Sequence, residues 1–247
     1  MVVDRVELLD LYNSLRQRVH FDLPPSAQLN VRLFVYECIH IIKNPSISNE
    51  LYYDALNLVD LQDEYKFQII ADTLKLLIVE SENISEVRLY TNNAMNFLKH
   101  LQDKVYQENY FDSLTGVFNY NYLQKIESEI SAKDFTLFFF DLDGLKKIND
   151  LYGHEHGNKL IQNFAKILKS SFRFDDLVIR YGGDEFIVIV FRNKLNPDKA
   201  IEKLNKHPQM IELNIAFSFG FSRNNEKNLK KTLSIADQLM YTQKESK

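Results

Sequence analysis

Apolar residues recur at three- and four-residue steps over the first third of the chain. In the segment 6–19, Leu8, Tyr12 and Leu15 fall on one face of a helix. The same periodicity predicts three further helices, between Pro24-Pro25 and Asn44-Pro45, over about 48–61 and over about 63–81. Together they predict a helical bundle over residues 1–84, a candidate sensory or regulatory domain. Its faces carry no metal, nucleotide or haem pattern that would name a ligand.

A long polar helix is expected next, over residues 85–110, as a linker. Its apolar positions alternate four- and three-residue steps, as in a short coiled-coil seam with one polar break: Val87, Thr91, Ala94, Leu98, Leu101 and Val105. The seam has two interpretations. It pairs with the same helix of a second chain, or it packs against the chain's own bundle.

The pattern changes after residue 110, where helical segments alternate with dense apolar runs. Four such runs predict strands, at 136–143, 177–181, 186–191 and 214–222. Because successive positions are apolar, both faces of these strands are expected to be buried. The pattern predicts a domain of α/β or α+β type over 111–247, with a sheet covered by helices.

Composition narrows the class of protein. The 247 residues are 45% hydrophobic and 26% charged, with a net charge of −4. This balance offers no broad basic surface, so a nucleic acid polymer is not the expected partner. Cys38 is the single cysteine, which excludes an intramolecular disulfide and a cysteine-based zinc cluster. No apolar run approaches a membrane span, and the amino terminus lacks the features of a signal peptide, so we expect a cytoplasmic protein without membrane insertion.

Two of the predicted strands end in carboxylates. Asp141 and Asp143 close the run "FFFDLDG", and Asp184 and Glu185 lie at a hairpin tip in "RYGGDEF". If the strands are neighbours, Asp141 and Asp184 converge, and like charges beside a core require a cation. Carboxylates that leave room for phosphate oxygens suit Mg²⁺ or Mn²⁺.

Simpler interpretations of the same residues exist. Asp143 is a suitable cap for the next helix, and the two glycines before Asp184 suit a hairpin whatever its function. Alternatively, these glycines leave room for a phosphate to approach the backbone.

Taken in order, four motifs resemble the GGDEF family of diguanylate cyclases. They are "DSLTGVFN", "DLDGLKKINDLYGHEHGN", "RYGGDEF" and "ADQLMYTQK", and the resemblance covers about Tyr110 to Lys247. It implies a palm-like α+β domain with a central, mostly antiparallel sheet flanked by helices, placed after the all-helical region and linker helix. It also implies that two domains, each holding one GTP, meet in a homodimer and make cyclic di-GMP and two pyrophosphates.

By this resemblance, Asp141, Asp184 and the Leu142 carbonyl hold the metal, and Glu185 is a second acid near it. Positioning and charge neutralisation dominate this phosphoryl chemistry. The residues implied to contact the nucleotide are Lys146, Asn149, Asn158, Lys244 and the backbone at Gly183. Those implied in an inhibitory site for the product are Arg173 and Asp176 of an RxxD motif, completed by Arg180.

The sequence departs from the family pattern at two places. Asn158 stands where the family has an aspartate that accepts from guanine, and an amide, with one acceptor and one donor, suits adenine better. The alternatives are therefore a purine-relaxed cyclase that also takes ATP and makes cyclic GMP-AMP or cyclic di-AMP, or an Asn158 that only caps the next helix. At the carboxyl end, Lys247 is the candidate substitute for an arginine of the family that holds the triphosphate.

Two other classes of function compete with an active cyclase. One is a catalytically silent receptor for cyclic di-GMP or a nucleotide, and the other is a helical adaptor whose GGDEF domain only dimerises. Receptors of this kind usually lose the hairpin acids, whereas Asp141, Lys146, Asp184 and Glu185 are all present. The intact acids favour an active enzyme.

Overall fold

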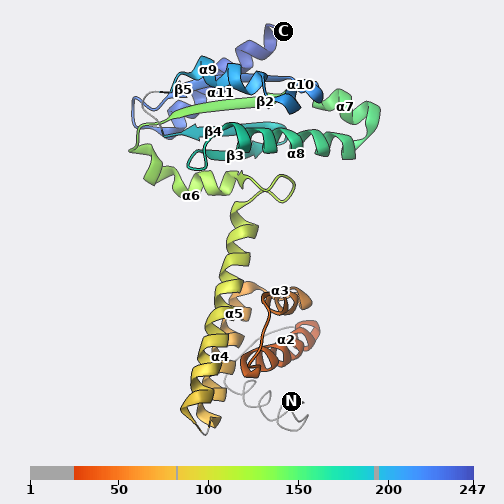
Figure 1. The fold of residues 1–247 in the computed structure, drawn as a ribbon, viewed down its shortest axis with the longest axis vertical. Helices are drawn as coiled ribbons and strands as arrows, with labels where there is room; N and C mark the ends of the chain where they lie inside the picture. The colour runs from red at the N-terminus through yellow and green to blue at the C-terminus, as the bar shows by residue number, and fades with distance from the viewer. Residues whose placement is uncertain (1–24, 82, 192–194) are drawn as a thin grey trace. The chain divides into compact units, whose positions relative to one another are not determined.

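The computed structural model describes residues 25–81, 83–191 and 195–247 (Figure 1). The chain forms two compact units, Met1–Tyr106 and Gln107–Lys247, and each is described by itself. The helix expected at residues 6–19 lies outside the described residues. Within the described residues, no helix is both long enough and apolar enough to cross a membrane.

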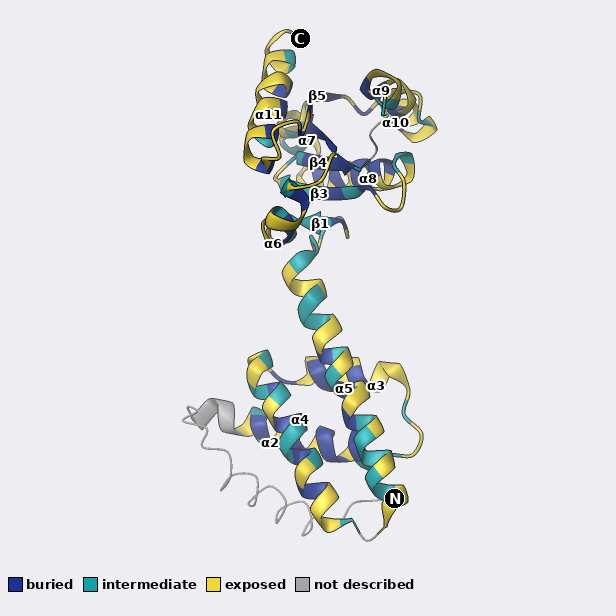
Figure 2. Ribbon diagram, turned by 90° about the vertical axis from the view of Figure 1, so that its left-hand side faces the viewer, coloured by how far each residue is buried: buried dark blue, intermediate teal, exposed yellow. Residues whose placement is uncertain are grey.

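The first unit is a helical bundle, as the periodicity predicted. Its helices are α2 (Pro25–Lys43), α3 (Asn49–Leu58), α4 (Asp63–Glu80) and most of α5 (Ile84–Tyr110). Their apolar faces share one core, in which Phe34, Leu56, Ile70 and Phe97 are buried (Figure 2). Proline and asparagine explain the sharp end of α2, because the segment after Lys43 begins with Asn44-Pro45.

The seam expected on α5 faces this same core. Ala94 and Leu101 are fully buried in it, and Leu98 and Val105 pack against it. The structure therefore favours the second interpretation of the pattern, in which α5 packs on its own bundle. The helical unit's role as a sensory or regulatory domain stays a prediction.

The second unit is built on a five-stranded sheet with the order β1-β3-β4-β2-β5. The strands are β1 (Phe118–Asn119), β2 (Thr136–Leu142), β3 (Leu177–Gly182), β4 (Glu185–Val190) and β5 (Phe217–Arg223). Every pairing is antiparallel except that of β1 with β3. The predicted mostly antiparallel sheet is confirmed, although the last strand begins at Phe217 rather than at residue 214.

Helices cover both faces of this sheet. The helices are α6 (Tyr120–Ser131), α7 (Leu145–Tyr152), α8 (His154–Ser171), α9 (Pro197–Asn205), α10 (Pro208–Glu212) and α11 (Leu229–Glu245). Alternate residues of β2 enter two separate cores: Phe138 and Phe140 pack with α8, α9 and α10, whereas Leu137 and Phe139 pack with α6 and α11. Burial on both faces explains the uninterrupted apolar run, and the α+β class is confirmed.

Helix α11 lies in close contact with β5, and a glycine makes this contact possible. A Cβ atom at Gly220 would lie 2.0 Å from the Ala236 carbonyl oxygen and 2.5 Å from the Met240 backbone nitrogen. Any larger residue would push the helix backbone away from the sheet. The contact fixes the height of α11 over the strands, and with it the position of Lys244 near its carboxyl end.

Candidate active site

The sheet register brings the predicted acids together. Asp141, at the end of β2, pairs directly with Glu185 at the start of β4. The Leu142 amide donates to the Asp184 carbonyl oxygen at 3.1 Å, which ties the hairpin tip to the end of β2. Three carboxylates, from the end of β2 and from the β3–β4 hairpin with the start of β4, thus lie together at one edge of the sheet.

Crowding and burial raise the pKa of two of these acids. Burial raises the pKa of Asp141, with further increases from the charges of Asp184 and Asp143 and an opposing hydrogen bond from Lys244. Burial also raises the pKa of Glu185, followed by the charges of Asp141, Asp237 and Asp184. Both carboxylates are therefore harder to ionise than usual, mainly because burial disfavours their charged form and also because other carboxylates lie nearby.

Two lysines at the end of the chain supply positive charge here. The Lys244 ammonium lies 2.6 Å from Asp141 Oδ1, and this hydrogen bond raises the pKa of Lys244. Lys247 donates to Asp143 Oδ2 at 2.5 Å and to the Phe217 carbonyl oxygen at 2.7 Å. Ser218 donates to the other oxygen of Asp143 at 2.8 Å.

Asp143 does not act as a helix cap, so that simpler interpretation is wrong. Helix α7 is preceded by Gly144 in a left-handed conformation, φ 77°, and no side chain caps it. The bonds to Ser218 and Lys247 hold the Asp143 carboxylate over β5 instead.

The donor chemistry of this edge fits a hard divalent cation. Within the described residues, no group of three or more His, Cys, Asp or Glu is already arranged as a metal site. Asp141, Asp184 and the Leu142 carbonyl nevertheless supply the oxygen donors that Mg²⁺ prefers, and such ions commonly use only one or two protein carboxylates. Burial is the main cause of the raised pKa of Asp141 and of Glu185, and the charges of neighbouring carboxylates, which a bound cation would offset, add to it.

The helical hairpin of α7 and α8 carries the residues predicted to contact the base. Asn149 lies on α7, and its buried Oδ1 has no hydrogen-bond partner within the described residues. Gly157 of α8 makes room for it, because a Cβ there would lie 1.9 Å from that oxygen. Lys146 and Asn158 are exposed on the same two helices.

Asn158 is not a helix cap either. Helix α8 begins at His154, five residues earlier than a cap at Asn158 would require, and its N-cap is Gly153 at φ 82°. A glycine in this conformation can end α7 and start α8 at once, so both boundaries fall there. Asn158 is left as an exposed amide within α8, with no capping role to explain it.

The residues predicted for product binding fall at two places. Arg173 and Asp176 share the turn between α8 and β3, where the Arg173 amide donates to Asp176 Oδ2 at 2.8 Å. Arg173 also lines a cavity of about 630 Å³ together with Lys199 and Lys203 of α9. Arg180 lies four residues further along β3, about 13 Å away along an extended strand.

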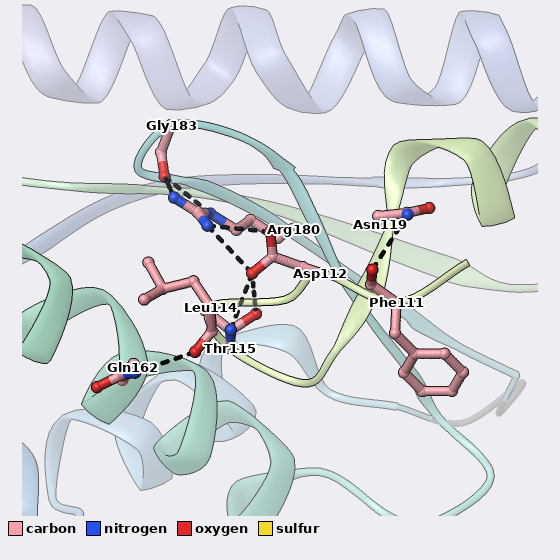
Figure 3. Close-up of polar contacts among 8 residues, drawn as sticks. All are labelled: Phe111, Asp112, Leu114, Thr115, Asn119, Gln162, Arg180 and Gly183. Carbon is pink, nitrogen blue, oxygen red and sulfur yellow. Dashed lines mark hydrogen bonds and ion pairs between the residues drawn. The ribbon is translucent and has the colours of Figure 1, made fainter. Parts of the chain in front are cut away.

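Figure 3 shows what Arg180 does at that end of β3. Its Nη1 donates to both carboxylate oxygens of Asp112, at 3.0 Å each. Its Nε and Nη2 donate to the Gly183 carbonyl oxygen, at 3.0 and 2.7 Å. The structure does not bring Arg180 together with Arg173 and Asp176, and its part in product binding stays a prediction.

Sequence reasoning missed three residues at or beside the site. Asp112 and Asp237 lie inside two of the quoted motifs, "DSLTGVFN" and "ADQLMYTQK", which gave a signal without a role. Ser218 gave no signal, because a lone serine in an apolar strand resembles any tolerated polar residue. Its importance comes only from the pairing of β5 with β2, which places it opposite Asp141.

Comparison with known proteins gives one family. The family described as "Diguanylate cyclase, GGDEF domain" matches residues 109–247. Diguanylate cyclase DgcS of Shewanella oneidensis is 32% identical over 147 residues, 55% of this chain and 50% of the relative. Diguanylate cyclase VdcA of Vibrio cholerae is 28% identical over 204 residues, 74% of this chain and 60% of the relative. The chain thus spans half to three fifths of the length of these curated relatives.

Two solved structures share the fold. Diguanylate cyclase SiaD of Pseudomonas aeruginosa, in complex with its activator SiaC, matches 98% of this chain and 96% of its own, with a TM-score of 0.52 and 20% identity. The coiled coil and GGDEF domain of DgcB from Caulobacter crescentus, in complex with c-di-GMP, matches 66% of this chain and 96% of its own, with a TM-score of 0.57 and 20% identity. At this identity the likeness concerns the fold alone.

The raised pKa of Glu185 leads to a prediction about stability. A carboxylate whose pKa is raised on folding stabilises the protein fully only below its unfolded pKa, and that stability is lost as pH rises through the folded value. Without divalent cations, Glu185→Gln should therefore raise the melting temperature at pH 7–8, by roughly 1–3 °C. The gain should shrink as the pH falls towards 4.5, the ordinary pKa of the side chain.

Differential scanning fluorimetry across this pH range measures the effect. Glu129→Gln is the matched control, because Lys133 lowers the pKa of Glu129 and its removal should give no gain. A Glu185→Gln protein that melts lower than the parent at pH 8 would contradict the prediction.

Proposed function

The chain belongs to the GGDEF-domain family, and from this premise we propose that it is a diguanylate cyclase. It condenses two GTP molecules into cyclic di-GMP and releases two pyrophosphates. The observation that carries the proposal is the edge of the sheet where Asp141, Asp184 and Glu185 crowd together, with Lys244 as a neutralising cation. A structural role alone would not require three carboxylates beside a buried core.

Each residue has a defined task in the proposed reaction. Asp141, Asp184 and the Leu142 carbonyl would hold Mg²⁺ or Mn²⁺, which when bound would neutralise phosphate charge and favour ionisation of the attacking hydroxyl. Glu185 lies beside these ligands as the second acid. Gly183 is exposed at φ 37°, with open space where a side chain would project, so the triphosphate can approach the backbone. Lys146 and Lys244 bind the triphosphate oxygens.

The bond changes require two active sites. In the first step, the 3′-hydroxyl oxygen of one GTP bonds to the α-phosphorus of the other, the hydroxyl proton passes to water, and the bond between that phosphorus and pyrophosphate breaks. Ring closure repeats the step in the opposite direction, so two domains must face each other as a homodimer. The dimer is proposed from this chemistry and not from the seam of α5, because Ala94 and Leu101 of the seam are buried in the helix's own bundle.

Product inhibition is the proposed role of the turn between α8 and β3. Arg173 offers a guanidinium fork to phosphate or guanine, and the lining of the adjacent cavity adds Lys199 and Lys203. Cyclic di-GMP, which carries two phosphodiesters, suits a cavity with three cations.

A relaxed choice of purine is the second candidate function. The buried, unpartnered Oδ1 of Asn149 offers one acceptor, and the exposed amide of Asn158 offers both an acceptor and a donor. Guanine presents two adjacent donors that a carboxylate at position 158 would accept, whereas an amide accepts only one. The mispairing is expected to weaken the preference for GTP, so that ATP also enters and mixed or adenine dinucleotides form.

The main prediction concerns Asp184. Purified protein with Mg²⁺ and GTP should form cyclic di-GMP, and Asp184→Ala should reduce the rate by roughly three powers of ten, because it removes a metal ligand. Mass spectrometry of the products measures this, with Asp103→Ala of α5 as the matched control. The specific rate should fall on dilution as the dimer dissociates.

Three outcomes would count against the main prediction. A parent protein that binds cyclic di-GMP but forms no product from GTP or ATP would indicate a silent receptor. An Asp184→Ala protein with full activity would remove the proposed site. Light scattering that finds a monomer cyclising at undiminished rate would remove the homodimer.

The inhibitory site gives a second prediction. Arg173→Ala should raise the cyclic di-GMP concentration that halves activity by at least about ten-fold, because a charge-assisted contact to phosphate is lost. Initial rates measured with added product test this, and Arg88→Ala, at an exposed arginine of α5, serves as the control. Equal inhibition of the parent and Arg173→Ala would refute the site.

The base choice gives a third prediction. Asn158→Asp should increase the preference for GTP over ATP by about 10- to 100-fold, because a mismatched hydrogen bond costs on the order of 1–3 kcal/mol once the bound base covers the side chain. Competition between GTP and ATP, with the dinucleotides separated by mass, measures the ratio. Asn163→Asp, five residues further along α8, is the matched control. If the parent already ignores ATP, Asn158 does not relax the choice.

A further inference from the structure

The guanidinium of Arg180 connects two segments that are far apart in the chain. Its four hydrogen bonds join Asp112, at the entry to the second unit, to Gly183, at the tip of the β3–β4 hairpin (Figure 3). The pair is largely shielded from solvent, since the side chains of Arg180 and Asp112 retain 16% and 20% of their accessible surface. Shielding, the contact of Nη1 with both carboxylate oxygens, and the two further bonds to Gly183 make this ion pair more rigid than an ordinary surface pair.

Asp112 is also held in place by hydrogen bonds within its own turn, independently of Arg180. Its Oδ1 accepts from the Thr115 amide at 2.9 Å and from the Thr115 hydroxyl at 2.6 Å. The turn is closed by two backbone bonds, from the Asp112 amide to the Val117 carbonyl and from the Gly116 amide to the Asp112 carbonyl, both 2.8 Å. The Leu114 carbonyl accepts from Gln162 of α8 at 3.1 Å (Figure 3). The carboxylate therefore presents a fixed acceptor edge.

The other side of Arg180 fixes the peptide that precedes Asp184. A trans peptide is planar, and its carbonyl and N–H point in opposite directions. When Arg180 holds the Gly183 carbonyl, the Asp184 N–H must face the opposite way. The following peptide is fixed too, since the Asp184 carbonyl accepts from the Leu142 amide. Both peptide planes that flank Asp184 are thus set by hydrogen bonds.

The hairpin needs such a restraint because two adjacent glycines form its tip. Gly182 and Gly183 are exposed, and Gly183, at φ 37°, has no atom within 4 Å of its Cβ position. Packing therefore does not limit Gly183, and glycine has more backbone freedom than any other residue. The register of β3 and β4 also shifts between Arg180 and Gly182.

We propose that Asp112 is a positioning residue for Asp184, acting through Arg180 and the Gly183 carbonyl. It orders the hairpin so that the Asp184 carboxylate meets Asp141 at the distance that a shared cation requires. The part of this inference that concerns activity depends on the proposed cyclase function, whereas the ordering of the hairpin does not. Asp112 follows the last residue of α5 by two positions, so the sequence that enters the catalytic unit also sets its metal-binding hairpin.

Hydrogen–deuterium exchange of the metal-free, full-length protein tests the ordering directly. Asp112→Asn keeps the shape of the side chain but loses its charge and one acceptor, so amides of 182–185 should exchange roughly ten-fold faster. Asp134→Asn is the matched control, because it breaks the ion pair with Lys227 at the opposite end of β2. Hairpin exchange at the parental rate in Asp112→Asn would overturn the proposal.

A second variant separates the positioning role from simple stability of the turn. Thr115→Val removes the hydroxyl bond to Asp112 but leaves the pair with Arg180, so the hairpin should exchange as in the parent. If Thr115→Val and Asp112→Asn accelerate the hairpin equally, Asp112 serves the turn alone and the positioning role is refuted.

Kinetics then test the link to the metal. In Asp112→Asn, the Mg²⁺ concentration for half-maximal rate should rise several-fold and kcat should fall roughly ten-fold or more, because a small misplacement of a catalytic group is costly. KM for GTP should change less, since Lys146, Asn149 and Lys244 are untouched. A change in KM alone would contradict the inference. A parent without cyclase activity would refute the proposed function, and the exchange result would still decide the role of Asp112.

Discussion

The meeting of carboxylates at one edge of the sheet is the constraint on which the second unit depends. The pairing of β2 with β4 places Asp141 directly opposite Glu185, and burial raises the free energy of their charged forms. The neighbouring elements offset part of that cost. Helix α11 can approach β5 only because Gly220 has no side chain, and this approach places Lys244 against Asp141.

Tightly packed strands and a loosely packed hairpin tip lie next to each other in this unit. Strands β2, β4 and β5 are packed on both faces, whereas the hairpin tip consists of two exposed glycines. In the proposed enzyme, a phosphate would use the open space at these glycines, whereas Asp184 in the next position would need order to hold a cation. Hydrogen bonds rather than side-chain packing provide the order, which leaves the space free.

The sequence predicted best what depends on local pattern. Apolar runs ending in acids placed Asp141 and Asp184 at one edge, and helical periodicity found α2 to α5 within a few residues. It could not predict contacts set by tertiary packing, such as Lys244 on Asp141, 103 residues apart, or Arg180 on Asp112, 68 residues apart. The suggested cap at Asn158 failed because a glycine with positive φ, Gly153, moved the helix start to His154.

The space beside Gly157 concerns the residues proposed to contact the base and not the residues proposed to carry out the reaction. The nearest atoms that a methyl group there would meet belong to the end of the Asn149 side chain and to one methyl of Leu145. The helical hairpin could absorb it by turning the Asn149 amide away, while the carboxylate edge, carried by different elements, would be untouched. In the proposed enzyme, base selection would rest on the helical hairpin and phosphate chemistry on the strand ends, so a substitution could alter the choice of nucleobase without altering the residues of the reaction.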